Sequence, residues 1–182
     1  MQIVVSDAGP LIHLAQIDQL QLLKKLFKHV SITEEVKNET VDEGINHGFA
    51  DAEIIGKTLQ EGWITVHHVS EQLAESVKRL ANGENISHPD AETLLLAKIK
   101  KAELLVDDKV VADLAKMYGI KTWNTWTILL ESLHKEFIEI SDINKAITER
   151  GKIRHKLSEK QVGEILRAAN AIAVHKKKSS GR

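Results

Sequence analysis

The feature that most constrains the fold of this chain is the placement of aspartates at the ends of short apolar segments. Residues 3–6 form one such segment and lead into Asp7, and residues 104–106 form another and lead into Asp107 and Asp108. In open parallel α/β sheets, ligands bind beyond the carboxyl ends of the strands, and acids gathered there hold hard divalent cations through oxygen. We therefore expect a metal site at one edge of a sheet.

Strand-like and helix-like segments alternate along the chain without an internal repeat. Expected strands cover residues 3–6, 30–32, 63–66, 104–106 and 120–123. Expected helices cover residues 10–28, 34–46, 51–61, a segment after Ser70, 88–101, 109–118, 125–136, 141–150 and 158–174, and Asn82-Gly83 is expected to break the chain. This alternation predicts an α/β fold with a central parallel sheet.

Length and composition limit the class of protein. The chain has 182 residues, which suits a domain with a substantial core, and it has no cysteine, which excludes disulfides and thiolate zinc sites. The absence of cysteine is compatible with a reducing cytosol. No segment approaches about 18 uncharged residues, so we expect a cytoplasmic protein with no membrane partner.

The net charge of −1 conceals two parts of opposite sign. Residues 150–182 carry ten Lys/Arg and two Asp/Glu, whereas residues 1–149 carry 15 Lys/Arg and 24 Asp/Glu, or a net charge of −9. We expect a domain over the first part and a basic helix and tail over the second, which could contact a polyanion. The candidate nucleic-acid contacts are Arg150, Lys152, Arg154 and Lys156. A solvated tail is the plain alternative.

Each acid also has a plain structural role that competes with a functional one. Asp7 precedes an expected helix and could simply accept hydrogen bonds from its first turn, and Asp90 lies three residues after Ser87, as in a capping box. Asp107 and Asp108 differ, because one carboxylate suffices to cap the helix that follows and the second then has no routine task. Adjacent anions also repel unless a cation or hydrogen-bond donors compensate.

Glu39 shows a conflict between the local pattern and the solvent. If helix 34–46 turns Val36 toward the core, Glu39 lies along the same side, where a charge is costly without a partner. Glu35 and Glu43 stand four residues before and after it, so an acidic stripe that faces water is the alternative.

Four of these segments occur in an order that resembles the PIN domain, and specifically the VapC-like branch of small prokaryotic PIN proteins. The matching segments are residues 3–12 (IVVSDAGPLI), 32–39 (ITEEVKNE), 90–97 (DAETLLLA) and 104–108 (LLVDD). The resemblance spans about residues 1–130 and implies a three-layer α/β/α sandwich, to which the last helices add a C-terminal extension. It also implies a ribonuclease that requires Mg²⁺ or Mn²⁺ and is often the toxin of a toxin–antitoxin pair. The partners it implies are RNA, an antitoxin protein and a second copy of the chain in a homodimer.

The resemblance assigns roles to individual residues. The catalytic acids that it implies are Asp7, Glu39, Asp90 and Asp108. The metal ligands that it implies are Asp7, Asp90, Asp108 and Asp107, the last as a close competitor of Asp108. The supporting residues that it implies are Glu92 and Thr125. The chain departs from the family at Gly9, where many relatives carry Ser or Thr, and at Asn124, where relatives of this branch often carry Gly.

The expected ligands indicate a mechanism. Carboxylate oxygens suit Mg²⁺ or Mn²⁺, which activate a water molecule for in-line attack on a phosphodiester, so no protein nucleophile is required. Histidines such as His13, inside an expected helix, are expected in packing or surface roles, and only His88 is expected near the site. The serious rival is a non-catalytic PIN-fold protein that binds RNA or a protein partner. Cleavage of single-stranded RNA that is lost on chelation would separate the two.

Overall fold

The computed structural model describes residues 3–152 and 157–179. The chain divides into two compact units, Met1–Thr125 and Trp126–Arg182. The first unit contains the sheet, and the second contains the last helices. The expected boundary between residues 149 and 150 stays a prediction, and helix α10 (Ile140–Lys152) runs through those positions without a break.

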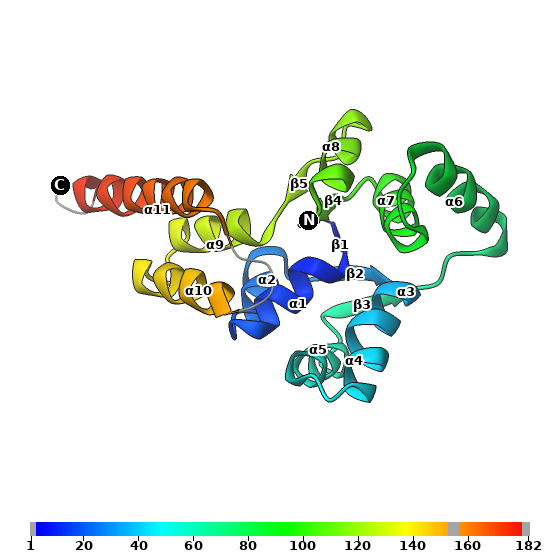
Figure 1. The fold of residues 1–182 in the computed structure, drawn as a ribbon, viewed down its shortest axis with the longest axis horizontal. Coiled ribbons are helices and arrows are strands. Elements are labelled where there is room, and N and C mark those ends of the chain that lie inside the picture. The colour runs from blue at the N-terminus through cyan, green and yellow to red at the C-terminus, as the bar shows by residue number, and fades with distance from the viewer. Residues whose placement is uncertain (1–2, 153–156, 180–182) are drawn as a thin grey trace. The chain divides into compact units, whose positions relative to one another are not determined.

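Five parallel strands form one sheet in the first unit (Figure 1). The strands are β1 (Val4–Ser6), β2 (Val30–Thr33), β3 (Ile64–His67), β4 (Glu103–Leu105) and β5 (Thr122–Trp123), in the order β3-β2-β1-β4-β5. Val5 of β1 pairs with Ser31 on one side and with Leu104 on the other. The central strand is therefore β1, and the expected α/β fold with a parallel sheet is confirmed.

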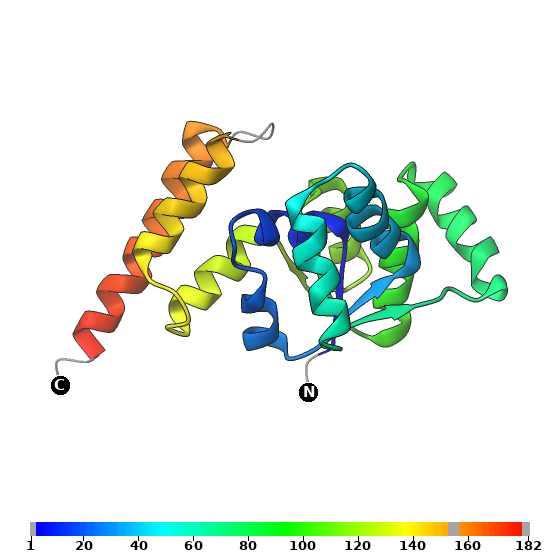
Figure 2. The same cartoon turned by 90° about the horizontal axis from the view of Figure 1, so that it is seen from below.

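Helices cover both faces of the sheet and complete three layers (Figures 1 and 2). One face carries α1 (Ala8–Gln16), α2 (Gln21–Phe27) and α5 (Ala50–Gln60), and the other carries α7 (His88–Lys100) and α8 (Lys109–Met117). Helix α6 (Glu71–Glu84) packs on α7. A continuous helical run follows β2 and consists of α3 (Glu34–Lys37), η1 (Asn38–Glu43) and α4 (Gly44–Asn46). Its middle part, η1, is a π-helix, a form often found at functional sites.

Buried apolar side chains fix the strand ends against the helices. Val5 and Leu104, on neighbouring strands, pack with Leu94 and Ala97 of α7 and with Val111 of α8, and all five side chains are buried. The two α7 residues are three positions apart and so lie on one face of the helix. This packing holds the carboxyl ends of β1 and β4 side by side.

The strand order places a crevice next to β1. The chain passes from β1 to β2 on one side and later returns to β4 on the other, which is the topological switch point where open α/β sheets bind ligands. Asp7 directly follows β1, and its backbone N–H donates to the carbonyl of Leu105 at 2.9 Å. Asp107 follows β4 after Val106. Both aspartates therefore leave the sheet at the same edge.

Two of the expected local structures were wrong. The segment 10–28 is two helices, because Asp18 adopts φ 56 between α1 and α2 and so ends the helical path. Asn82-Gly83 does not break the chain, since α6 continues to Glu84 and ends where Asn85 adopts the left-handed conformation. Aspartate and asparagine tolerate positive φ better than most residues, so each can stop a helix without a glycine or proline.

The second unit contains most of α9 (Thr125–His134), and all of α10 and of α11 (Glu159–Ser179). Helices α10 and α11 pack together, and Ile143 of α10 and Ile165 and Ala169 of α11 are buried. Arg154 and Lys156 lie outside the described residues, so the expected RNA contacts of this segment stay predictions. In the described part of the chain, the helices are too short or too polar to cross a lipid bilayer.

Candidate metal centre

Asp7 is a partly buried carboxylate at the end of the central strand. It holds the position before the first turn of α1, but its side chain accepts no capping hydrogen bond there. The pKa of Asp7 is raised to about 6. Burial is the main cause and the negative charges of Asp90 and Glu39 add to it, while hydrogen bonds from the backbone N–H groups of Ala8 and Gly9 act in the opposite direction. The charged side chains that act most on Asp7 are therefore acidic, and a nearby cation would stabilise its ionised form.

Asp90 brings a second acid to Asp7 from the start of α7. Ser87 caps that helix by accepting a hydrogen bond from the Asp90 N–H at 3.2 Å, and its hydroxyl donates to the Asp90 carboxylate. This arrangement supplies the serine half of the capping box considered from the sequence, while the Asp90 carboxylate bonds the Ser87 hydroxyl. Asp90 also raises the pKa of both Asp7 and Glu39, so its carboxylate lies within electrostatic reach of both. The structural and the functional interpretations of Asp90 are therefore compatible.

Glu39 contributes the third acid from the π-helical segment η1. Partial burial raises the pKa of Glu39, and the nearby charges of Asp90 and Glu43 raise it further. Its side chain is exposed although Val36, three residues earlier, is buried, so the expectation that both lie on the core side holds only in part. The wider π-helical turn accounts for the difference, because spacings derived from 3.6 residues per turn do not apply to it.

Asp107 is held by hydrogen-bond donors from two directions. His13 Nδ1 lies 2.5 Å from its Oδ2, the Thr125 N–H donates to Oδ1 at 2.7 Å, and the Thr125 hydroxyl donates to Oδ2 at 2.6 Å. Burial opposes ionisation of Asp107, but the bonds from His13 and Thr125 outweigh it and hold the pKa below its ordinary value. Both oxygens are thus engaged within the protein.

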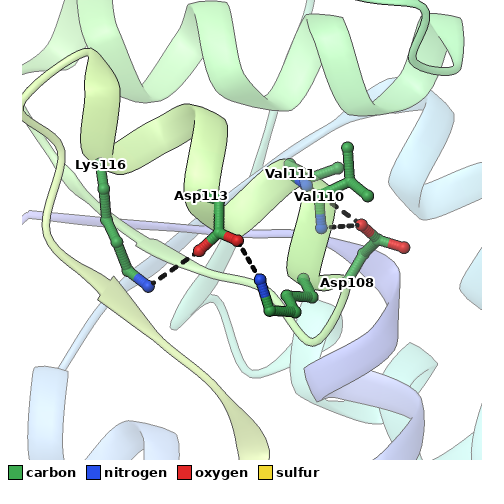
Figure 3. Close-up of polar contacts among 6 residues, drawn as sticks. Asp108, Val110, Val111, Asp113 and Lys116 are labelled. Carbon is green, nitrogen blue, oxygen red and sulfur yellow. Dashed lines mark hydrogen bonds and ion pairs between the residues drawn. The ribbon is translucent and has the colours of Figure 1, made fainter.

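Asp108 caps helix α8. Its Oδ1 accepts from the N–H groups of Val110 at 2.7 Å and Val111 at 3.0 Å, and the side chain is exposed (Figure 3). Farther along α8, Asp113 pairs with Lys116 on the solvent side (Figure 3). One oxygen of Asp108 thus serves as a helix cap, and its expected role as a metal ligand stays a prediction.

Gly9 permits a close approach between α1 and the end of β4. A Cβ atom at position 9 would lie 3.4 Å from the Cβ of Asp107. His13 follows Gly9 by four residues and so lies on the same side of α1, which explains how it reaches Asp107. The sequence interpretation of His13 as an ordinary helix residue missed this contact. The spacing of four residues between Gly9 and His13, which places both on one side of a helix, is the sequence signal that could have indicated this contact.

Glu92 and Thr125, the expected supporting residues, have different surroundings. Glu92 is buried, and burial raises its pKa, with Thr33 lowering it through a hydrogen bond and Glu35 raising it. Within the described residues its Oε2 is buried without a hydrogen-bond partner. Glu92 therefore faces the end of β2, whereas Thr125 binds Asp107 at the end of β4. His88, the histidine expected near the site, lies close enough to Glu92 to lower its pKa through electrostatic attraction.

We call Asp7, Glu39 and Asp90 the acid cluster. Among the described residues, no three Asp, Glu or His side chains are close enough, as they stand, to hold a metal ion. The donor chemistry nevertheless fits one, because the cluster offers only carboxylate oxygens, the ligands of Mg²⁺ and Mn²⁺. Asp90 raises the pKa of both Asp7 and Glu39, and Glu39 raises that of Asp7. Bound positive charge would remove that repulsion.

Comparison with known proteins assigns the chain to a family. The model of the family DUF3368, described as a PIN domain, matches residues 3–171, and the chain belongs to this PIN domain family. PIN domains are generally nucleases and typically bind divalent metals. The match identifies the PIN domain family and does not assign the chain to the VapC-like branch. No curated protein matches the chain.

Solved structures share the fold. A PilT N-terminus domain protein from the hyperthermophilic archaeon Sulfolobus solfataricus P2 aligns with a TM-score of 0.51 at 19% identity, over 72% of this chain and 94% of that one. The protein PAE2754 from Pyrobaculum aerophilum aligns with a TM-score of 0.52 at 18% identity, over 71% of this chain and 96% of that one. At these identities the likeness concerns the fold alone.

Proposed function

We propose that this PIN domain protein is an endoribonuclease that requires Mg²⁺ or Mn²⁺ and hydrolyses phosphodiester bonds of single-stranded RNA. The observation that supports it most is the raised pKa of Asp7, a partly buried acid whose acidic neighbours are Asp90 and Glu39. Structural acids normally gain donors on folding, as Asp107 does. The backbone donors of Asp7 do not offset its burial and its acidic neighbours, and an acid in that situation at a ligand-binding sheet edge suits the binding of a cation.

Asp7, Asp90 and Glu39 would hold the ion. When bound, Mg²⁺ or Mn²⁺ supplies the positive charge that offsets a phosphate group and stabilises the charge that develops on the leaving oxygen. The chain positions two of the carboxylates. The backbone bond from Asp7 to Leu105 fixes the first, and the two hydrogen bonds between Asp90 and Ser87 fix the second. Asp107 is proposed as a positioning residue, because it is bonded both to His13, in the last turn of α1, and to Thr125, which follows β5.

RNA is the proposed substrate because of the distribution of charge. Residues 1–149 carry a net charge of −9 and would repel phosphates in the absence of a bound metal, whereas residues 150–182 carry +8. Basic residues outside the acid cluster would therefore supply the affinity for the phosphate backbone. We do not extend this proposal to a toxin role, since only the family resemblance implies one.

The proposal is tested by cleavage of defined substrates. Purified full-length protein is incubated with end-labelled single-stranded RNA and with DNA of the same sequence, in Mg²⁺, in Mn²⁺ and with chelator. We expect internal cuts in RNA that require metal and that Asp90→Asn abolishes. Asp18→Asn is the matched control, because Asp18 is an exposed aspartate away from the acid cluster. Cleavage that persists in chelator or in Asp90→Asn would contradict the proposal.

A further inference from the structure

A pocket of about 380 Å³ lies beside the acid cluster, among α1, η1, α4 and α5. Its lining residues are Ile12, Gln16, Glu39, Thr40, Glu43, Gly44, His47, Phe49 and Asp51. Glu39 belongs to both this pocket and the acid cluster. A ligand that fills the pocket therefore reaches the place where we expect the metal.

One wall of the pocket is a pair of stacked rings. The rings of His47 and Phe49 lie 5.7 Å apart between centroids with 17° between their planes. His47 Nδ1 lies 2.7 Å from the backbone carbonyl of Glu43, and because a carbonyl only accepts, this nitrogen carries the proton. The His47 ring is thus held in place from two sides. Phe49 is 56% exposed, so one aromatic surface is offered to solvent.

The backbone that carries this wall is closely packed. A Cβ atom on Gly44 would lie 2.6 Å from the Cβ of Ala52, so only glycine permits this approach of α4 to α5. The close approach sets the path of the short connection that bears His47 and Phe49. The wall is therefore formed before any ligand binds.

The charges of the pocket select the kind of ligand. Glu39, Glu43 and Asp51 line it, and these carboxylates repel phosphate groups but accept hydrogen bonds from amino groups. A nucleobase is uncharged and flat, stacks on aromatic rings, and in adenine, cytosine and guanine carries an exocyclic amino donor. Uracil lacks that donor. The apolar side chains of Ile12 and Phe49 suit the faces of a base.

We propose that this pocket binds one unstacked base of the RNA substrate, next to the bond that is cleaved, and prefers bases with an exocyclic amino group. Phe49 provides the stacking surface, and Glu43 and Asp51 accept the amino hydrogens. This inference rests on the proposed function, since it names where that substrate is read. Phe49 would then determine base specificity, and it can be substituted without changing any residue of the acid cluster.

The first test uses nucleosides, which contain no phosphate and need no metal. The ring resonances of His47 and Phe49 are followed by NMR during titration of full-length protein with adenosine, cytidine and uridine. Adenosine and cytidine should shift these resonances, and the affinity for uridine obtained from the same titration should be about tenfold weaker. Phe49→Ala should weaken adenosine binding by about tenfold, as expected for removal of one base stack. Met117→Ala, which removes an apolar side chain that is 83% exposed and does not line the pocket, is the control and should leave binding unchanged.

The second test measures cleavage of single-stranded RNAs that differ at one position beside the cut. Phe49→Ala should flatten the preference for that base and raise KM more than it lowers kcat. Wild-type protein that binds adenosine at His47 but cuts no RNA would refute the proposed function and leave the pocket inference standing. Cleavage with no nucleoside effect at His47 and Phe49 would overturn the pocket inference alone. Binding of an arginine-rich hexapeptide in place of nucleosides would overturn it too, because it would identify a protein-binding groove.

Discussion

His13 Nδ1 lies 2.5 Å from the Oδ2 atom of Asp107, although 94 residues separate them in the chain. The contact gives a buried carboxylate a donor and helps to hold its pKa below the ordinary value. Asp7 leaves the same edge of the sheet from the neighbouring strand, yet its pKa is raised to about 6. The pKa values of two acids at one sheet edge are thus shifted in opposite directions. We use this difference to distinguish Asp107, a structural carboxylate, from Asp7, a candidate metal ligand.

The His13 contact should contribute measurably to stability. His13→Ala removes a donor from the partly buried Asp107, so we expect the free energy of unfolding to fall by about 1–3 kcal/mol. Denaturant unfolding near pH 7 measures the change. His68→Ala is a matched control, because His68 contacts Glu34 at the same distance of 2.5 Å but both side chains are at least half exposed. That substitution should cost less than about 1 kcal/mol. Equal decreases in both variants would show that burial does not strengthen the His13 contact.

The sequence predicted the pattern of elements but not how their ends meet. Asp107 and Asp108 were singled out because a helix needs one capping acid, and the structure shows Asp108 as the cap and Asp107 as the acid with other partners. Which of the two faces inward depends on the exit angle of β4, which no local pattern encodes. The expected convergence of Asp7, Glu39, Asp90 and Asp108 stays a prediction. The charges of Asp90 and Glu39 raise the pKa of Asp7, but among the described residues no three acids or histidines lie close enough to hold a metal ion.

Two further differences arise from tertiary structure. The helical spacing around Val36 placed Glu39 toward the core, but the π-helix η1 changes that spacing, and the sequence contains no sign of it. His13 was expected in a packing or surface role, because its partner Asp107 is 94 residues away and no local pattern links the two. Short-range rules predict elements and caps, whereas contacts between distant segments depend on packing.

Asp7 should make the metal-free protein less stable as the pH rises. Its folded-state pKa of about 6 exceeds the ordinary 3.8, so the folded protein binds more protons between these values. The stability that Asp7 contributes is fully present below pH 3.8 and is lost as the pH rises through about 6. Asp7→Asn should therefore stabilise the protein in chelator at pH 7.5 by at most about 3 kcal/mol, with the gain vanishing near pH 4. Unfolding curves of both proteins across this range measure the difference, and a gain that is constant with pH would contradict it.

Asp108 should act as a helix cap more than as a metal ligand. Asp108→Ala removes the acceptor for the N–H groups of Val110 and Val111 and should cost about 1 kcal/mol, whereas Asp108→Asn keeps a capping oxygen and should cost little. We expect Asp108→Asn to retain metal-dependent cleavage of RNA. Denaturant unfolding and a cleavage assay on the same preparations measure both effects. An Asp108→Asn variant with normal stability but no cleavage would instead support Asp108 as a metal ligand, the role that the family resemblance implies.

Divalent metal should stabilise the folded protein through the acid cluster. Binding to the folded state alone stabilises it by RT ln(1 + [L]/Kd), or about 2.7 kcal/mol at a concentration 100 times Kd. Mn²⁺ and Mg²⁺ should raise the Tm of the wild type, and Asp90→Asn should reduce the increase. Asp18→Asn, with its exposed side chain, should respond like the wild type. An unchanged wild-type Tm across millimolar metal would count against metal binding by Asp7, Asp90 and Glu39.

The basic segment should increase affinity for RNA without taking part in cleavage. Substitution is a cleaner test than truncation, because α10 and α11 pack together and both contain buried apolar side chains, such as Ile143 and Ile165. The test variant replaces four residues by glutamine: Arg150, Lys152, Arg154 and Lys156. The control variant replaces four exposed lysines of the first unit: Lys28, Lys57, Lys78 and Lys101.

Salt dependence is the informative measurement for these variants. Removal of one lysine or arginine that binds a phosphate should flatten the slope of log K against log salt concentration by about 0.7 for a single strand. The test variant should therefore show a flatter slope than the control variant, while both cleave RNA at the wild-type rate at saturation. Identical slopes would make the segment a solvated or protein-binding appendage. Absence of cleavage at saturating RNA would instead place these basic residues in the active site, because affinity no longer limits the rate when all the protein is bound.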